Sequence, residues 1–236
     1  MKPRSPEEGI LIDATPHACP YLPDRIAVLP TRWYPEPIDP STFDDLLARS
    51  DRRVGQTLYR PSCPSCKACI GIRIPLADFE PSKSQRKILK QNEDIRITVG
   101  PPAVDSRRLA LFNRHKLERG LAHRPTSIEH YANWLAQSCV QTVEINYWLE
   151  EQLVGVGIVD LGAIAASSAY FYFDPDESSR SLGTFSVLHE AQWLKERGLR
   201  FYYLGLWIEE CPSMAYKNRF HPHEILVDGE WVRIED

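Results

Sequence analysis

Three cysteines stand at intervals of three residues in the stretch YRPSCPSCKACIGIRIP, at Cys63, Cys66 and Cys69. Thiolates at this spacing are soft ligands for zinc or for an iron–sulfur cluster, and both of these need four ligands. The same ligands serve either group, so the spacing does not choose between them. The alternative is a set of reactive or merely buried thiols that holds no metal.

The cysteines lie in a basic part of an acidic chain. Residues 49–120 carry 16 Lys and Arg against 7 Asp and Glu, whereas the whole chain of 236 residues has a net charge of −4. Such a block is typical of a protein that binds a polyanion, nucleic acid above all, although a solvated basic surface has the same composition. Within it, EPSKSQRKILKQNED predicts a capped helix with Lys83, Arg86, Lys87 and Lys90 as neighbours on one side. We expect these cations to face an external anion.

The sequence predicts neither a membrane span nor a signal peptide. It contains no run of 18 apolar residues, and its beginning, MKPRSPEEGILIDATPHAC, lacks a continuous apolar stretch. We therefore expect a cytoplasmic protein. In that compartment clustered cysteines bind metal or do redox chemistry more often than they form disulfides.

The second half of the chain predicts the elements that must position any reacting groups. Residues 140–175 are typical of an antiparallel meander of three strands, because β-branched and aromatic residues are interrupted by short polar turns. An amphipathic helix follows from about Leu182, and a strand returns at Phe201. A strand, a helix and a returning strand suit a parallel crossover.

This arrangement resembles the N-acetyltransferase (GNAT) architecture. We therefore predict an α+β fold with two parts. Residues 126–236 form the acyltransferase-like domain, and residues 1–125 form a small, Cys-rich, basic N-terminal subdomain.

The turn before the predicted crossover helix bears on the acyl donor. In the N-acetyltransferase superfamily the backbone N–H groups of this turn hold the pyrophosphate of coenzyme A. Here the turn reads RSLGTF, in which Arg180 and Gly183 fit the superfamily pattern but Phe185 replaces a small residue. A phenylalanine there should crowd a pyrophosphate. An acyl group carried by another molecule, such as an RNA, would suit both this turn and the basic block.

Five segments together identify the chain as resembling a known family. They are CPYLPDRIA, DRRVGQTLYRPSCPSCKACIGIRIP, FEPSKSQRKILKQNEDI, YFYFDPDESSRSLGTFSVLHEAQW and YYLGLWIEECPSMAYKNRFHPHEIL. They look like the arginyl-tRNA–protein transferases, in particular their short bacterial branch, the aspartate/glutamate leucyltransferases. The resemblance implies transfer of leucine from Leu-tRNA to an N-terminal Asp or Glu of a protein, which marks that protein for degradation by the N-end rule pathway.

The implied reaction converts an activated ester into a peptide, so it needs no catalytic cofactor. Its nucleophile is an α-amine with a pKa of about 7.7–8.0, and positioning the two reactants should matter most. Our candidates for proton transfer are Asp174 and Glu190, and Tyr203 is the candidate oxyanion donor. Each also has a plain structural alternative. Asp174 could form an Asp-Pro turn, Glu190 could be an exposed acid on a helix, and Tyr203 could be a core aromatic.

Binding candidates follow from the same resemblance. An acidic acceptor side chain favours an arginine fork, for which Arg60, Arg73 and Arg219 are candidates. Lys217 is expected to contact the end of the tRNA, although a solvated lysine is the alternative. Gly183 and Thr184 of the turn complete the substrate-binding or tRNA-binding set, together with Lys83, Arg86 and Lys90.

The resemblance also suggests a fourth ligand for the cysteine triplet. Cys19 of CPYLP belongs to the other cysteine motif of the family, and His17 is the fallback. The predicted site of Cys19, Cys63, Cys66 and Cys69 would hold a structural zinc ion or iron–sulfur cluster and would pin the N-terminal lead-in to the basic region.

Three alternative functions stay open at this point. The same mechanism serves arginyl transfer, since only the short bacterial architecture favours leucine. An N-acetyltransferase that depends on acetyl-coenzyme A would use the same C-terminal fold. A zinc module that binds nucleic acid without catalysis would leave the acyltransferase half unexplained.

Overall fold

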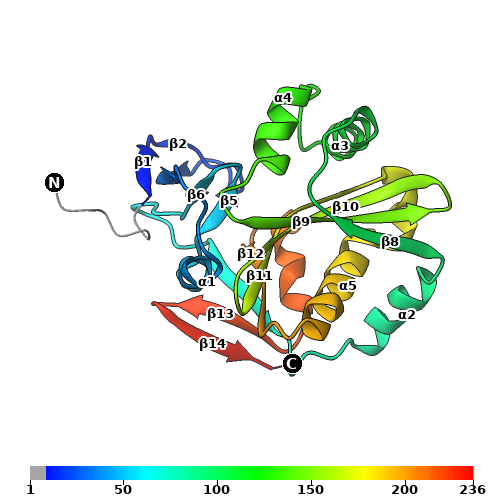
Figure 1. The fold of residues 1–236 in the computed structure, drawn as a ribbon. Coiled ribbons are helices and arrows are strands. Elements are labelled where there is room, and N and C mark those ends of the chain that lie inside the picture. The colour runs from blue at the N-terminus through cyan, green and yellow to red at the C-terminus, as the bar shows by residue number, and fades with distance from the viewer. Residues whose placement is uncertain (1–8, 236) are drawn as a thin grey trace.

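A twisted sheet of eight strands forms the centre of the molecule in Figure 1, a computed structural model that describes residues 9–235. The strands run in the order β14-β13-β7-β12-β11-β10-β9-β8. Their bounds are β7 (Ile70–Pro75), β8 (Ile95–Gly100), β9 (Gln141–Leu149), β10 (Gln152–Leu161), β11 (Ala165–Phe173), β12 (Phe201–Trp207), β13 (His223–Val227) and β14 (Glu230–Ile234).

Two small sheets are built from the N-terminal segments. One has the order β1-β4-β6-β5 and the other pairs β2 with β3. Their bounds are β1 (Ile10–Asp13), β2 (His17–Ala18), β3 (Ile26–Ala27), β4 (Thr31–Trp33), β5 (Arg52–Val54) and β6 (Thr57–Tyr59). The first four of these strands, at residues 10–33, make the beginning of the described chain a set of short strands joined by loops.

The helices lie on both faces of the central sheet (Figure 1). Helix α5 packs on one face with α2 beside it, while α1, α3 and α4 cover the other face. Their bounds are α1 (Pro40–Ala48), α2 (Lys83–Gln91), α3 (Ser106–Glu118), α4 (Ile128–Tyr131), α5 (Leu182–Glu196) and α6 (Pro212–Ala215), with short irregular helices η1 (Ala132–Ala136), η2 (Pro175–Arg180) and η3 (Tyr216–Arg219). Among the described residues, no helix combines the length and the apolar character needed to cross a bilayer.

Local sequence signals explain where several helices begin. The Asp39 side chain caps α1, where Pro40 occupies the first turn. Ser82 and Gln85 form a capping box at the start of α2. The capped helix predicted within EPSKSQRKILKQNED is confirmed as α2.

The predicted meander and crossover are also confirmed. Strand β10 pairs antiparallel with β9 and with β11. Helix α5 then carries the chain back to β12, which pairs parallel with β11. The mixed α+β fold and the acyltransferase-like arrangement of its second half are thus as expected.

The N-terminal part of the chain enters the central sheet. Strand β7 lies between β12 and β13, and β8 forms the edge next to β9. The division drawn after residue 125 therefore runs through one continuous sheet, and it stays a prediction about function rather than a gap between two sheets.

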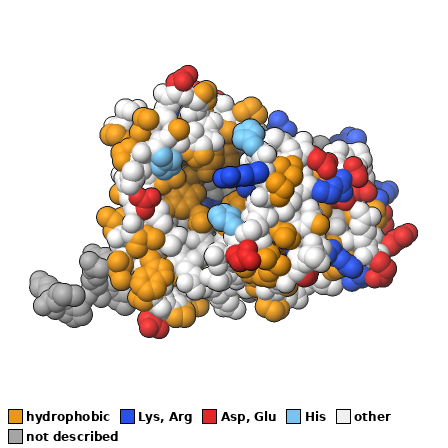
Figure 2. Space-filling model, turned by 90° about the horizontal axis from the view of Figure 1, so that it is seen from above, with side chains coloured by type: hydrophobic (Ala, Val, Ile, Leu, Met, Phe, Trp, Pro, Cys, Tyr) orange, Lys and Arg blue, Asp and Glu red, His pale blue; other side chains and the backbone are white. Residues whose placement is uncertain are grey.

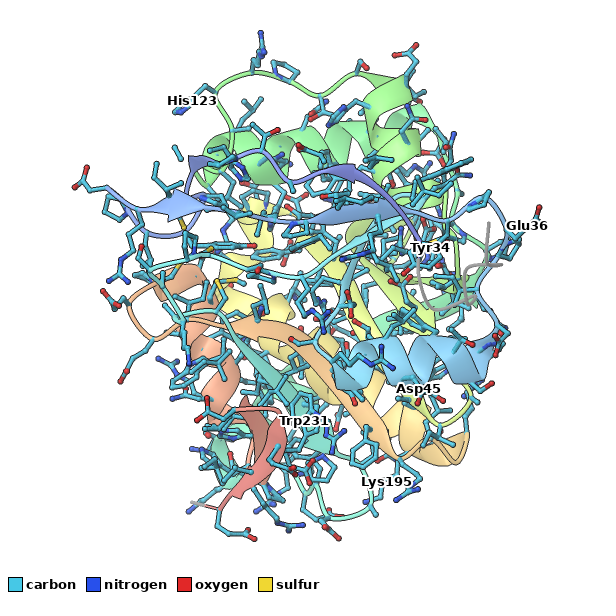
Figure 3. The ribbon with its side chains drawn as sticks, turned by 90° about the vertical axis from the view of Figure 1, so that its left-hand side faces the viewer. Tyr34, Glu36, Asp45, His123, Lys195 and Trp231 are labelled. Carbon is cyan, nitrogen blue, oxygen red and sulfur yellow. The ribbon has the colours of Figure 1, made fainter. Side chains whose placement is uncertain are left out.

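The C-terminal hairpin closes the side of the molecule that carries α1. Figure 3 shows Trp231 of β14 below α1, whose Asp45 is labelled. The Trp231 Nε1 donates a hydrogen bond of 3.1 Å to the carbonyl of Ala48, and its ring packs edge-on against Tyr203. The hairpin thereby ties α1 to β12.

Candidate functional site

The central sheet opens where β11 and β12 separate. The two strands pair through three residues only, from Ala165 with Phe201 to Ser167 with Tyr203. Beyond that point β11 continues to Phe173 and β12 to Trp207 without pairing to each other. The groups around this fork are the candidate site.

Glu190 is the acidic group of the fork. It projects from α5 and is 1% exposed, and Oε1 lies 3.0 Å from the hydroxyl of Tyr147. The Tyr202 hydroxyl donates to the other oxygen, Oε2. Burial raises the pKa of Glu190 from 4.5 to about 7, and the two tyrosine hydroxyls oppose that shift. A carboxylate with this pKa can take up and release a proton near neutral pH.

The backbone of β10 leaves room for this carboxylate only because residue 157 is a glycine. A Cβ on Gly157 would lie 2.4 Å from Oε1 of Glu190. No real Cβ is found so close to an oxygen. Gly157 therefore sets the position of Glu190.

A hydroxyl chain leads from Glu190 toward the opening of the fork. The Ser168 side chain lies near the Tyr202 hydroxyl, where it opposes the rise that burial causes in the pKa of Tyr202, and this hydroxyl donates to Glu190. Tyr202 is fully buried, whereas Ser168 is partly exposed. The arrangement can pass a proton from the opening to the buried carboxylate.

Two buried cations face the same fork. Arg52 of β5 is 9% exposed, and its Nη1 and Nη2 donate to the Ser167 hydroxyl at 2.7 Å and to the Ser168 carbonyl at 2.6 Å. Lys217 of η3 is 8% exposed, and its Nζ donates to the Leu206 carbonyl at 2.8 Å. Burial lowers the pKa of Lys217 to about 7, with Arg52 as the second cause.

The neighbouring arginine is paired. Arg53 Nε lies 2.8 Å from both carboxylate oxygens of Asp160, and both side chains are 1% exposed. Arg53 also bonds the carbonyls of Gly55 and Gln137. The two adjacent arginines of β5 thus differ in their partners. Arg53 is paired with a carboxylate, whereas Arg52 has only neutral hydrogen-bond acceptors.

Of the predicted catalytic residues, the structure brings only Glu190 to the fork. Asp174 is 2% exposed, but Arg114, Gln152 and the backbone of Asp176 occupy its oxygens, so it caps η2. Tyr203 points to the opposite face of β12 from Tyr202 and accepts a hydrogen bond of 2.7 Å from Arg73. Asp174 is thus held by η2 and its neighbours, and Tyr203 is held by Arg73. Neither side chain contacts Glu190.

The three arginines predicted to bind a carboxylate are placed elsewhere. Arg73 is held by Glu224 at 2.6 Å and stacks on Phe201 and Trp231. Arg60 is 44% exposed, bonds the Arg49 carbonyl and lies 3.9 Å from Asp51. The Arg219 side chain is exposed on η3.

The predicted basic helix is α2, and it lies beside the crossover. Lys83, Arg86, Lys87 and Lys90 are all exposed on it. The Gln91 and Asn92 amides donate to the carbonyls of Ser179 and Arg180, just before α5. Gln85 reaches the Arg219 carbonyl next to η3. The cationic face and the fork are therefore linked through the first residues of α5 and through η3.

The turn before α5 differs from the expectation at one point. Phe185 is 5% exposed and packs edge-on against Tyr147, so its ring fills the core instead of crowding the turn. Gly183 has open space beside it, and Thr184 is partly exposed. Arg180 is held by Asp94 and Glu177, each at 2.9 Å.

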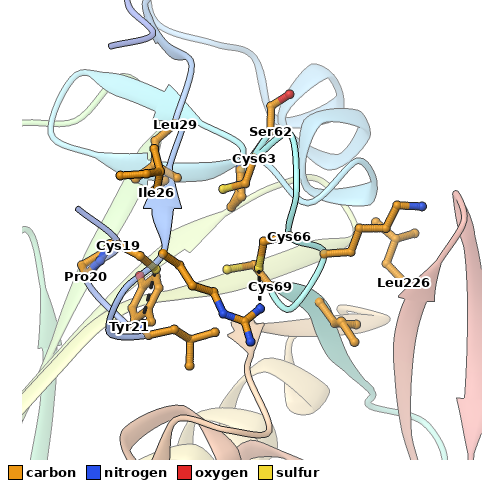
Figure 4. A pocket seen from close by; sticks show the side chains of 16 residues that line it. Cys19, Pro20, Tyr21, Ile26, Leu29, Ser62, Cys63, Cys66, Cys69 and Leu226 are labelled. Carbon is orange, nitrogen blue, oxygen red and sulfur yellow. Dashed lines mark hydrogen bonds between the residues drawn. The ribbon is translucent and has the colours of Figure 1, made fainter. Parts of the chain in front are cut away.

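The four predicted metal ligands line one pocket of about 310 Å³ (Figure 4). N–H groups of Leu22 and Val28 point at the sulfurs of Cys19 and Cys63, each at 3.4 Å. Arg25 Nη1 donates to Cys66 Sγ at 3.3 Å. Such donors suit thiolates, and the donor set is that of a zinc or iron–sulfur site.

The pocket does not by itself amount to a coordination shell. Across residues 9–235, no group of three or more His, Cys, Asp and Glu side chains is arranged to hold a metal ion. The fallback ligand His17 is exposed, and its ring bonds the Thr15 carbonyl. A metal bound by the four cysteines stays a prediction.

A hollow faces upward in the orientation of Figure 1. Figure 2 shows hydrophobic side chains lining it, with a Lys or Arg and His side chains around it. A surface of this composition can receive an apolar side chain and an anionic group together.

Sequence reasoning missed four residues of the fork: Arg52, Tyr147, Ser168 and Tyr202. The pair YY at 202–203 lies on the strand that the sequence predicted, but the sequence did not show which of the two rings faces α5. Arg52 gave no such signal, because the charged pair RR at 52–53 in so short a strand is more typical of an exposed edge.

Known proteins resemble this chain over most of its length. The family descriptions "Arginine-tRNA-protein transferase, C terminus" and "N terminus" match residues 107–227 and 17–87. The aspartate/glutamate leucyltransferase of Marinobacter nauticus is 39% identical over 92% of this chain and 92% of its own. Proteins of the same name from Acinetobacter baumannii and Pseudomonas putida are 35% identical over 93% of this chain and 82% and 94% of theirs.

Solved structures resemble a smaller part. The C-terminal domain of a lysylphosphatidylglycerol synthetase from Agrobacterium fabrum has 12% identity and a TM-score of 0.48, and covers 61% of this chain and 48% of that chain. FemX has 9% identity and a TM-score of 0.45, and covers 69% and 59%.

Proposed function

The chain belongs to the arginine-tRNA-protein transferase family, and from this premise we propose that it transfers leucine from Leu-tRNA to the N-terminal Asp or Glu of a protein. Its relatives at 35–39% identity bear the name aspartate/glutamate leucyltransferase. The observation that carries the chemistry is the buried Glu190 carboxylate, with a pKa of about 7, at the fork between β11 and β12.

The reaction needs one proton to leave the nucleophile. The acceptor α-amine attacks the carbonyl carbon of the leucyl ester, and a tetrahedral intermediate forms. The C–O bond to the tRNA ribose then breaks as the amide forms, and the ribose hydroxyl leaves with a proton. An α-amine with a pKa of about 7.7–8.0 is already partly neutral near pH 7.5, so a moderate base suffices.

Glu190 is the base in this proposal. The attacking nitrogen lies at the open side of the fork, beside Ser168. Its proton passes through the hydroxyls of Ser168 and Tyr202 to Glu190, and Tyr147 holds the carboxylate from the other side. The leaving ribose takes a proton from the same chain. Positioning of the two reactants contributes the larger share of the rate.

The basic helix α2 holds the tRNA in this scheme. Lys83, Arg86 and Lys90 are exposed together on a helix tied to the start of α5. An acceptor stem lying on α2 would direct its ester end along the turn at Gly183 and Thr184 toward the fork. Phosphate contacts of this kind position a nucleic acid without reading its sequence.

The remaining expectations complete the proposal. The modified protein would be marked for degradation by the N-end rule pathway, in the cytoplasm. The cysteine pocket would hold a structural zinc ion or iron–sulfur cluster through Cys19, Cys63, Cys66 and Cys69, which takes no part in the chemistry.

One assay tests this function. Labelled leucyl-tRNA and arginyl-tRNA are offered to peptides that begin with Asp, Glu, Arg or Ala. We expect leucine on the Asp and Glu peptides only. Transfer of arginine to the same peptides would show that Arg-tRNA is the donor, and the proposed mechanism would stand. Acetyl transfer from acetyl-coenzyme A, without any response to charged tRNA, would replace the function.

A further inference from the structure

Arg52 is a buried cation without a counter-anion, and Lys217, whose pKa burial lowers to about 7, becomes a second one when it is protonated. Neither forms an ion pair with any residue in the described range 9–235, and their hydrogen bonds go to hydroxyl, carbonyl and thioether acceptors. Burying an unpaired charge is costly, so buried charges are normally paired. Because arginine stays charged, the unpaired guanidinium points to an anion supplied from outside the chain, and that anion would also favour the protonated form of Lys217.

The nearby acids are already engaged. Asp160 is bound by Arg53, and Glu190 receives both tyrosine hydroxyls. Asp51 lies 3.9 Å from Arg60. No described carboxylate is therefore left to neutralise Arg52 and Lys217 in place of a ligand.

The backbone of β12 is shaped around Arg52. Gly205 has φ +93°, and a Cβ there would lie 2.9 Å from Nη2 of Arg52. Positive φ and missing side chain together let the guanidinium reach the strand. Arg52 uses two of its five N–H donors on Ser167 and Ser168. The planar guanidinium therefore keeps three donors that a carboxylate can accept.

We propose that Arg52 and Lys217 bind the side-chain carboxylate of the acceptor's N-terminal Asp or Glu, and so select acidic N-termini. This inference rests on the proposed function and assigns its specificity to residues outside the proton path. Arg52 bonds the carbonyl of Ser168, whose hydroxyl begins that path. In an N-terminal Asp or Glu, the carboxylate lies one or two methylene groups from the carbon that bears the amine. One residue can therefore present its amine to Ser168 and its carboxylate to Arg52.

A tRNA phosphate is the competing anion, and the geometry favours it less. The esterified ribose carries its phosphate on the 5′ side, away from the ester. A phosphate would also bring a bulky tetrahedral group into a site where both cations are more than nine-tenths buried.

The experiment compares isosteric peptides. The ratio of kcat/KM for an N-terminal Asp peptide to that for the matched Asn peptide is measured with Leu-tRNA for the wild type, Arg52→Gln and Lys217→Met. Arg197→Gln, an equal charge change at the exposed end of α5, is the control. We expect the ratio to fall by ~30-fold or more in both test variants and to stay unchanged in the control, because a desolvated charge pair is lost.

Each other outcome overturns the inference. An equal loss for both peptides shows that Arg52 and Lys217 are structural. A raised KM for Leu-tRNA with an unchanged ratio assigns the site to the tRNA phosphate. If Arg52→Gln does not fold, Lys217→Met decides alone, together with calorimetric binding of the Asp peptide. Failure of the wild type to transfer leucine to any peptide instead refutes the proposed function.

Discussion

Tyr202 and Tyr203 are adjacent on β12 and reach opposite sides of the central sheet. The Tyr202 hydroxyl donates to Glu190 under α5, whereas the Tyr203 hydroxyl accepts from Arg73 on the face that α1 and the C-terminal hairpin cover. The pair offers a matched comparison, because both rings are buried and each loses one hydroxyl on substitution by phenylalanine.

We expect Tyr202→Phe to lower kcat by ~10²-fold, because it interrupts the chain from Ser168 to Glu190. Tyr203→Phe should change kcat much less, since its hydroxyl serves Arg73. Single-turnover transfer from Leu-tRNA measures both. The reverse order would restore Tyr203 as the oxyanion donor suggested by the sequence.

Glu190→Gln should change how stability depends on pH. The folded-state pKa of Glu190 is raised from 4.5 to about 7, so the folded protein holds a proton that the unfolded chain releases. The resulting stabilisation is fully present below about pH 4.5 and is lost as pH rises through about 7, a difference on the order of 3 kcal/mol.

The variant should therefore lose less stability than the wild type between pH 5 and 8, as urea unfolding at several pH values would show. Its transfer rate should fall by ~10²-fold or more. Parallel pH profiles for the two proteins would mean that Glu190 titrates normally and is not the base.

Gly157→Ala tests the position of the carboxylate without changing a titratable group. The new methyl group would lie 2.4 Å from Oε1 of Glu190 and would push it away from Tyr147. We expect a lower kcat with unchanged tRNA binding. Gly100→Ala, at the end of β8, is the control, because open space surrounds that glycine. Equal activity of both variants would show that the placement of Glu190 does not matter.

Replacing Lys83, Arg86 and Lys90 with alanine should weaken tRNA binding. Each lost phosphate contact should flatten the slope of log affinity against log salt by about one unit. Filter binding at several salt concentrations measures this slope. Alanines at Lys195, Arg197 and Arg200, at and just after the C-terminal end of α5, remove the same charge as a control. An unaltered slope in the α2 variant would place the tRNA on another surface.

Cys66→Ser tests the cysteine pocket. If the four thiols hold a metal, the variant should release it and melt at a lower temperature, because metal binding and folding are coupled. Metal analysis of protein purified without oxygen gives the content directly. Cys139→Ser, a buried cysteine outside the pocket, should keep the metal. Wild-type protein that contains neither zinc nor iron would rule the site out.

The sequence predicted where helices and strands lie better than it predicted which strands pair with each other. Hydrophobic periodicity sufficed for the meander, for α5 and for the returning strand, because those signals are local. It could not show that β7 pairs with β12 and β13, since those partners are more than a hundred residues away along the chain. Drawing a boundary after residue 125 was natural for the same reason.

The site illustrates the same limit at the level of single residues. Glu190 was proposed, but its burial depends on Gly157 and on two tyrosines of other strands. Asp174 has a motif-like position, yet Arg114 of α3 holds it. The face of Tyr202 is decided by register, and a shift of one residue would exchange it with Tyr203. The burial of a side chain and its hydrogen-bond partners depend on segments that are distant in sequence, so local sequence patterns do not predict them.

The place of β7 also has a consequence for how the protein is made. Residues 70–75 leave the ribosome long before β12 and β13, yet both of its ladder partners belong to those late strands. The nascent chain therefore carries an apolar strand with two open edges until residues 201–236, which hold β12 and β13, emerge. A separately expressed C-terminal fragment would lack that strand. We therefore expect neither this fragment nor the remaining N-terminal part to be an active enzyme by itself.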